Sequence, residues 1–149
     1  MTNKLLLVDY ENVQQLDFTL LGDGHQVAIF VGANQKNVPI DLVTAAQKLG
    51  GRVEWRRVEG SGSNALDFHI ACELGRVLER SPNVHCTVLS KDKGFDPLLR
   101  HLNMNGLVAG ASTACSSWAP KLRQRANRTT SEQSSCSERR SRMRGRARG

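Results

Sequence analysis

Three aspartates are the residues of this sequence best placed to do chemistry. Asp9 ends a run of four apolar residues near the start of the chain, and Asp92 follows a second apolar run. Asp67 falls in the first turn of an expected helix, on the side that packs against a core. In a chain of alternating strands and helices, such positions share the carboxyl edge of a parallel sheet, where open α/β folds bind ligands. The simpler alternatives are a strand-ending turn at Asp9 and a favourable helix-dipole interaction at Asp67.

Carboxylates gathered at one edge would repel each other unless a cation lay between them. The chain has no cysteine or histidine at metal-ligand spacing, so the ligands would be oxygen atoms alone. Such a set favours Mg²⁺ or Mn²⁺, which activate water and stabilise a leaving oxygen in phosphodiester cleavage. Asp96, which precedes a proline at the start of the next helix, suits either this group of acids or a helix N-cap.

The hydropathy pattern predicts the elements that would position these acids. We expect an α/β fold: a single three-layer domain with a mostly parallel sheet of about five strands, flanked by helices. The third strand alternates polar and apolar residues, which is typical of a position near the sheet edge. A fifth strand would start at residue 107, but the pattern breaks after Gly110. The other expected strands cover residues 5–8, 27–32, 52–58 and 85–90, and the expected helices cover 38–49, 65–80 and 95–105.

Charge divides the 149-residue chain into two parts. Residues 1–110 carry eleven Lys/Arg and twelve Asp/Glu, whereas residues 111–149 carry ten and two. We therefore expect a domain over 1–110 and a disordered Arg/Ser-rich tail over 111–149. The tail would either bind RNA through its charge or result from a frame change, since the composition shifts abruptly after Gly110.

The cysteines and the N-terminus bear on the cellular compartment. The four cysteines form no pairing pattern, so free thiols in a reducing compartment are expected. The sequence shows no signal peptide and no apolar run of membrane-spanning length, which predicts a cytoplasmic protein without a membrane partner.

Three segments together resemble the PIN-like nucleases, closest to the NYN/PIN type of bacterial PIN-like domains. They are Leu-Val-Asp-Tyr-Glu-Asn at 7–12, Gly-Ser-Asn-Ala-Leu-Asp at 62–67 and Leu-Ser-Lys-Asp-Lys-Gly-Phe-Asp at 89–96, and the resemblance covers about residues 4–109. It implies one or two divalent metals and cleavage of single-stranded RNA. Asp9, Asp67 and Asp92 become catalytic metal ligands. Because Gly94 stands where that type usually has another acid, the role of Asp96 as a substitute ligand stays open.

The same resemblance assigns supporting roles. Asn12 would orient a ligand, and Ser90 would hydrogen-bond within its turn. Asn64 is a candidate cap of the second helix. Glu11 suits either a metal-facing acid or a solvated turn residue, and neither is favoured.

Lysines near the acids are candidates for holding the RNA backbone. These are Lys91, Lys93 and Lys36, although turn lysines are also commonly just solvated. Beyond the RNA substrate, a homodimer or an antitoxin-like protein partner stays open.

Three alternative interpretations remain. The first is a non-catalytic PIN-like module that binds RNA or protein. The second is a dinucleotide site, since residues 60–65 fit G-x-G-x-x-A, although they do not belong to the first βα unit. The third gives a general-base role to His69 or His101, each of which would otherwise be a hydrogen-bonded or exposed helical histidine.

Overall fold

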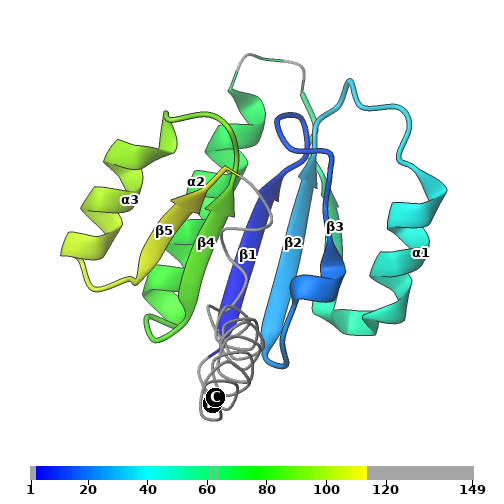
Figure 1. The fold of residues 1–149 in the computed structure, drawn as a ribbon. Coiled ribbons are helices and arrows are strands. Elements are labelled where there is room, and N and C mark those ends of the chain that lie inside the picture. Colours follow the sequence, from blue (N-terminus) through cyan, green and yellow to red (C-terminus); the bar gives the residue numbers. More distant parts are fainter. Residues whose placement is uncertain (1–2, 61, 63, 114–149) are drawn as a thin grey trace, which may run out of the picture. The chain divides into compact units, whose positions relative to one another are not determined.

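A parallel five-stranded sheet with helices on both faces forms the part of the chain that the computed structural model describes, residues 3–60, 62 and 64–113 (Figure 1). No helix among these residues is long and apolar enough to cross a membrane. The strands are β1 (Lys4–Asp9), β2 (His25–Val31), β3 (Val53–Arg57), β4 (His85–Leu89) and β5 (Ala109–Ser112). The helices are α1 (Ile40–Lys48), α2 (Ala65–Arg80) and α3 (Phe95–Met104), with single 3₁₀ turns at Phe18–Leu20 and Gly50–Arg52. The predicted α/β fold is confirmed.

The strand order β3-β2-β1-β4-β5 puts β1 at the centre of the sheet. All pairs are parallel, and the register sets Asp9 beside Phe30 of β2 and Val8 beside Leu89 of β4. The chain builds outward from β1 in one direction to β3 and then crosses to β4 on the other side of β1. The connections after β1 and β4 leave to opposite faces of the sheet, so the carboxyl ends of these two strands form its topological switch point, where open α/β sheets bind ligands.

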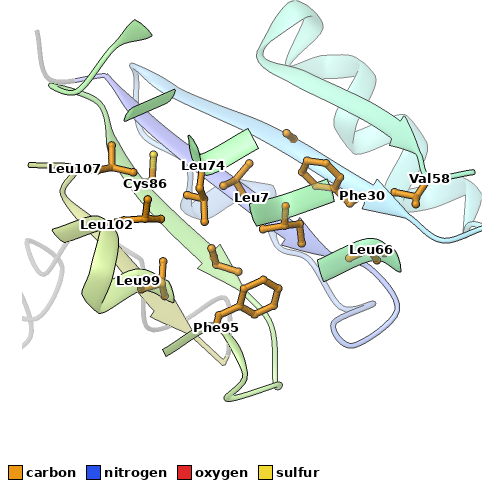
Figure 2. Close-up of a cluster of buried hydrophobic side chains, with 13 residues drawn as sticks. Leu7, Phe30, Val58, Leu66, Leu74, Cys86, Phe95, Leu99, Leu102 and Leu107 are labelled. Carbon is orange, nitrogen blue, oxygen red and sulfur yellow. The ribbon is translucent and has the colours of Figure 1, made fainter. Parts of the chain in front are cut away.

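Two apolar clusters pack the sheet between its helices. One contains Leu7 of β1 with the inward sides of α2 and α3 (Figure 2). The other contains Leu6 and Val8 with α1 and the segment after β1. Neighbouring residues of β1 therefore point to opposite faces and are buried on both, which explains its uninterrupted apolar run.

The hydropathy pattern of α2 predicts which side of this helix is buried. Its buried residues Leu66, Ile70 and Leu74 recur every four positions and form the stripe that packs on the sheet. The observed bounds Ala65–Arg80 are those expected from the sequence. This packing fixes the direction of the first turn, which carries Asp67.

Two helix starts differ from the expected caps. Asn64 precedes α2 in a left-handed conformation with φ of 65°, and its side chain makes no capping hydrogen bond. The N-cap of α3 is Gly94, whereas Asp96 lies exposed in the first turn of that helix. An acid in the first turn still interacts favourably with the helix dipole.

The fifth strand is shifted relative to the expectation. Leu107 is buried in the core instead of opening the strand, and β5 runs from Ala109 to Ser112 beside β4. The Ser112 carbonyl accepts a hydrogen bond from the backbone N–H of Ser90, 3.0 Å away. From residue 114 onward, the tail lies outside the described residues. Its predicted disorder and RNA binding therefore stay predictions.

Candidate active site

Asp9 is a buried carboxylate held by three hydrogen bonds at the end of the central strand. Its side chain is 1% exposed. The Asn12 backbone N–H donates to Oδ1 at 3.2 Å, and the Asn12 side-chain amide donates to Oδ2 at 2.5 Å. The Ser90 hydroxyl donates to the same Oδ2 at 2.7 Å, across 81 residues of sequence. Donors on both oxygens fix the orientation of this side chain.

Ser90 links the carboxyl ends of β1 and β4. Besides donating to Asp9, its Oγ accepts a hydrogen bond from the Asp92 backbone N–H at 3.1 Å. The Asp92 Oδ1 in turn accepts from the Gly94 backbone N–H at 2.8 Å, which closes the turn into α3. The turn after β4 is thereby positioned by a residue of β1.

Asp67 reaches the same edge from the first turn of α2. Burial raises the pKa of its carboxyl group, and the negative charges of Asp9, Asp92 and Glu11 raise it further, in that order. The Asp67 side chain makes no hydrogen bond or ion pair with any other described residue. Three carboxylates from two other segments therefore act on Asp67, and we call Asp9, Glu11, Asp67 and Asp92 the carboxylate cluster.

Glu11 is the member of the carboxylate cluster for which the sequence favoured no role. Its carboxylate lies against Gly32 at the end of β2, where a Cβ atom would overlap it. Glycine at position 32 is therefore what admits the Glu11 side chain to this place. A signal was present in the sequence, because glycine directly follows the second apolar strand, but it does not say which side chain needs the room.

The carboxylate cluster has no basic partner among the described residues. The ion pairs of this part of the chain join Arg56 to Glu54 and Glu73, and Arg76 to Glu73, on the β3 and α2 side. In the described residues, no three His, Cys, Asp or Glu side chains form a group close enough to hold a metal as they stand. The donor set itself, oxygen atoms bearing uncompensated charge, fits a hard divalent cation.

Several predicted site residues lie around the carboxylate cluster and not within it. Asp96 is exposed on α3, and its charge is not among those that raise the pKa of Asp67. Lys93 is exposed in the turn after β4, and Lys36 is exposed in the loop after β2. Lys91 lines a groove of about 1150 Å³ that also contains Glu11 and Asn12.

Asn64 shares a second, smaller pocket with Glu11. This pocket has a volume of about 230 Å³ and is also lined by residues that follow β2 and β3. The Asn64 amide thus stays near the carboxylate cluster, although its predicted capping bond is absent.

The two helical histidines lie apart from the Asp9 network. His69 lines a pocket between β3 and α2 together with Arg57. His101 lies in the last turns of α3, and its Nε2 atom is 3.3 Å from the side-chain nitrogen of Asn105.

Comparison with known proteins bears on the family. The sequence model of one family, described as PIN domain, matches residues 3–111. The match takes in β1 to β4, all of β5 except its last residue, and every member of the carboxylate cluster. Searches of curated proteins and of solved structures found no significant match.

Proposed function

This chain belongs to the PIN domain family, and from that premise we propose that it is a metal-dependent endoribonuclease acting on single-stranded RNA. The family indicates a nuclease-like module that interacts with nucleic acid; the RNA substrate and the metal are our proposals. The observation that carries them is the carboxylate cluster: burial and the charges of three other acids raise the pKa of Asp67, which has no basic partner in the described residues. Groups whose pKa values are perturbed in this way cluster at functional sites, and a bound cation would neutralise the repulsion between these carboxylates.

In this proposal, Asp9, Asp67 and Asp92 hold Mg²⁺ or Mn²⁺, and Glu11 is the fourth carboxylate available to it. A bound ion of this kind lowers the pKa of water and so supplies a nucleophile for phosphodiester hydrolysis. Ser90 and Asn12 hold the Asp9 carboxylate in a fixed orientation, since all their hydrogen bonds to it are donated. Asp96, exposed on α3, would join only through a change of side-chain position.

Substrate binding is proposed along the groove that contains Glu11, Asn12 and Lys91. Its volume of about 1150 Å³ is large enough for an extended chain and not only for a small molecule. Lys91 would contact phosphate there, and Lys93 and Lys36 would contribute charge from neighbouring loops. The proposal places the protein in the cytoplasm, where RNA is available.

A cleavage assay with Asp67→Asn tests the nuclease directly. Asp67 is a better position for this substitution than Asp9. Three groups donate hydrogen bonds to the Asp9 carboxylate, and an asparagine at position 9 would turn its own NH₂ donor toward one of them. Loss of one metal ligand should cost several kcal/mol of transition-state stabilisation, or about 100-fold or more in rate. Asp23→Asn, the same chemical change at an exposed site before β2, is the matched control and should cleave normally.

The assay should offer single- and double-stranded RNA and DNA, each with Mn²⁺ and with EDTA. Cleavage of single-stranded RNA only with Mn²⁺, and only when Asp67 is intact, is the expected result. Undiminished cleavage by purified Asp67→Asn would contradict the assignment.

The competing function is a PIN-like module that binds RNA or protein without cutting. It is favoured by one observation, that the described side chains do not already form a three-ligand group. Calorimetric titration with Mn²⁺ separates the two functions. The nuclease should bind Mn²⁺ with an affinity that Asp67→Asn weakens, whereas a binding module has no need of the ion.

A further inference from the structure

Phe68 is a large apolar side chain that α2 presents to solvent beside the carboxylate cluster. It is 70% exposed and directly follows Asp67 in the first turn of the helix. In the part of the chain that the structure describes, the other large exposed apolar residues lie on other elements: Ile40 opens α1, Met104 ends α3, and Val108 precedes β5. Because parallel strands and their helices alternate in direction, Met104 and Val108 belong to the opposite edge of the sheet from Phe68.

The side chains around Phe68 are small or polar. Asn64, four residues earlier, Cys72, four residues later, and His69 are exposed, and Ala65 and Ala71, three residues away, are half-buried. Among the described residues of α2, Phe68 is therefore the one large apolar side chain exposed to solvent. Protein interfaces bury contiguous apolar surface, whereas a single exposed aromatic ring among polar groups suits a flat, polar-edged ligand.

Beside the same stretch of α2 lies a pocket that holds charges of both signs. Cys72 and His69 line this pocket of about 420 Å³, and its charged lining residues are Arg56, Arg57, Arg76, Glu54 and Glu73. Arg56 and Arg76 pair with these glutamates, but the exposed Arg57 forms no ion pair with any described residue. A phosphodiester backbone that runs from Phe68 along α2 to this pocket would therefore meet an uncompensated arginine.

We propose that Phe68 is a stacking platform for one nucleobase of the RNA next to the cleaved phosphodiester, with Arg57 holding the adjoining backbone. This inference rests on the proposed RNA substrate. Every base has a π-face, so stacking of this kind gives affinity with little sequence preference. Phe68 is a binding residue here and takes no part in the chemical step.

Affinity for a fluorescent single-stranded RNA, measured by anisotropy in EDTA, tests the platform without cleavage. Phe68→Ala should weaken binding about 5- to 150-fold, the range for one stacked base. Phe68→Trp should retain the affinity, and Phe68→Leu, apolar but not aromatic, should lose most of it. Met104→Ala is the matched control, since Met104 is 87% exposed and lies on another element. Equal affinity of the wild type, Phe68→Leu and Phe68→Ala would overturn the proposal, and so would failure of the wild type to bind RNA.

An oligonucleotide series with one abasic nucleotide at each position tests the contact itself. The wild type should lose affinity at one position, and Phe68→Ala should be insensitive to the abasic nucleotide there. Equal sensitivity of the two proteins at every position would refute stacking. If Phe68→Ala instead changes only the sedimentation mass, the ring belongs to a protein interface and the proposal is wrong.

Failure of this inference can be told from failure of the nuclease. Cleavage that depends on Asp67, together with unchanged RNA affinity of Phe68→Ala, would remove the platform and leave the nuclease. RNA binding that depends on Phe68, without cleavage in Mn²⁺, would keep the platform in a non-catalytic module.

Discussion

Replacing Asp67 with asparagine should make the fold more stable while removing metal-dependent activity. The partly buried Asp67 carboxylate faces the charges of Asp9, Asp92 and Glu11, and both effects raise its pKa. A raised pKa in the folded state means that ionisation of this group costs more in the native protein than in the unfolded chain. Asparagine keeps the shape of the side chain and removes the charge, so the free energy of unfolding should rise.

The size of the gain is limited by solvent. Asp67 is only half-buried, so water screens part of the repulsion, and we expect a gain on the order of 1 kcal/mol in the free energy of unfolding at pH 7 and low salt. In a folded region of about a hundred residues, this corresponds to a rise of about 4 °C in Tm. High salt should shrink the difference.

The pH dependence of this gain has a definite sign. The carboxyl group of Asp67 in the unfolded chain titrates near its ordinary pKa of 3.8, and in the folded protein it titrates higher. Below the unfolded value the group is neutral in both states, so the wild type and Asp67→Asn should be about equally stable. As pH rises through the two values, the wild type loses stability relative to the variant, and the difference then levels off.

Thermal unfolding in EDTA, followed by circular dichroism from pH 3 to 8, measures this difference. Asp23→Asn is the control, because Asp23 is exposed and outside the carboxylate cluster. Saturating Mn²⁺ should reverse the order, since an ion that binds only the native wild type stabilises it by mass action. A lower Tm for Asp67→Asn than for the wild type at pH 7 in EDTA would refute the repulsion on which the site is built.

Two further substitutions test the supports of the carboxylate cluster. Ser90→Ala removes the buried hydroxyl that donates to Asp9, and loss of a hydrogen bond to a charged group should cost about 1.5 to 3 kcal/mol, visible as a lower urea midpoint with an unchanged m-value. An unchanged midpoint would mean that this bond does not hold the strand ends together. Gly32→Ala introduces a Cβ atom into the space of the Glu11 carboxylate, a flexible group that can move away. We therefore expect the free energy of unfolding, obtained from Tm, to change by no more than about 1 kcal/mol. Mn²⁺ binding, measured by calorimetry, should become weaker. An unchanged Mn²⁺ affinity would exclude Glu11 from the metal site.

Long regular elements were predictable because their signals are local. The four apolar residues before Asp9 are enough to indicate a strand buried on both faces, and β1 is that strand. Apolar residues follow Asp67 at helical intervals, which predicts that Asp67 lies on the side of α2 that packs on the sheet, and its side chain is half-buried. These apolar residues are Ala71, Leu74 and Leu78. The start of β5 was predicted two residues early, because Leu107 is equally apolar in a strand and in a loop that packs on the core.

The sequence by itself determined that acids follow apolar strands or open helices, and this is a local property of hydropathy and turn chemistry. Only the tertiary structure decided which groups those acids meet. The bond from Ser90 to Asp9 depends on β4 pairing with β1, and the contact of Glu11 with Gly32 depends on β2 pairing on the other side. Strand order is a long-range outcome of packing two apolar faces at once, so residue spacing alone does not reveal it.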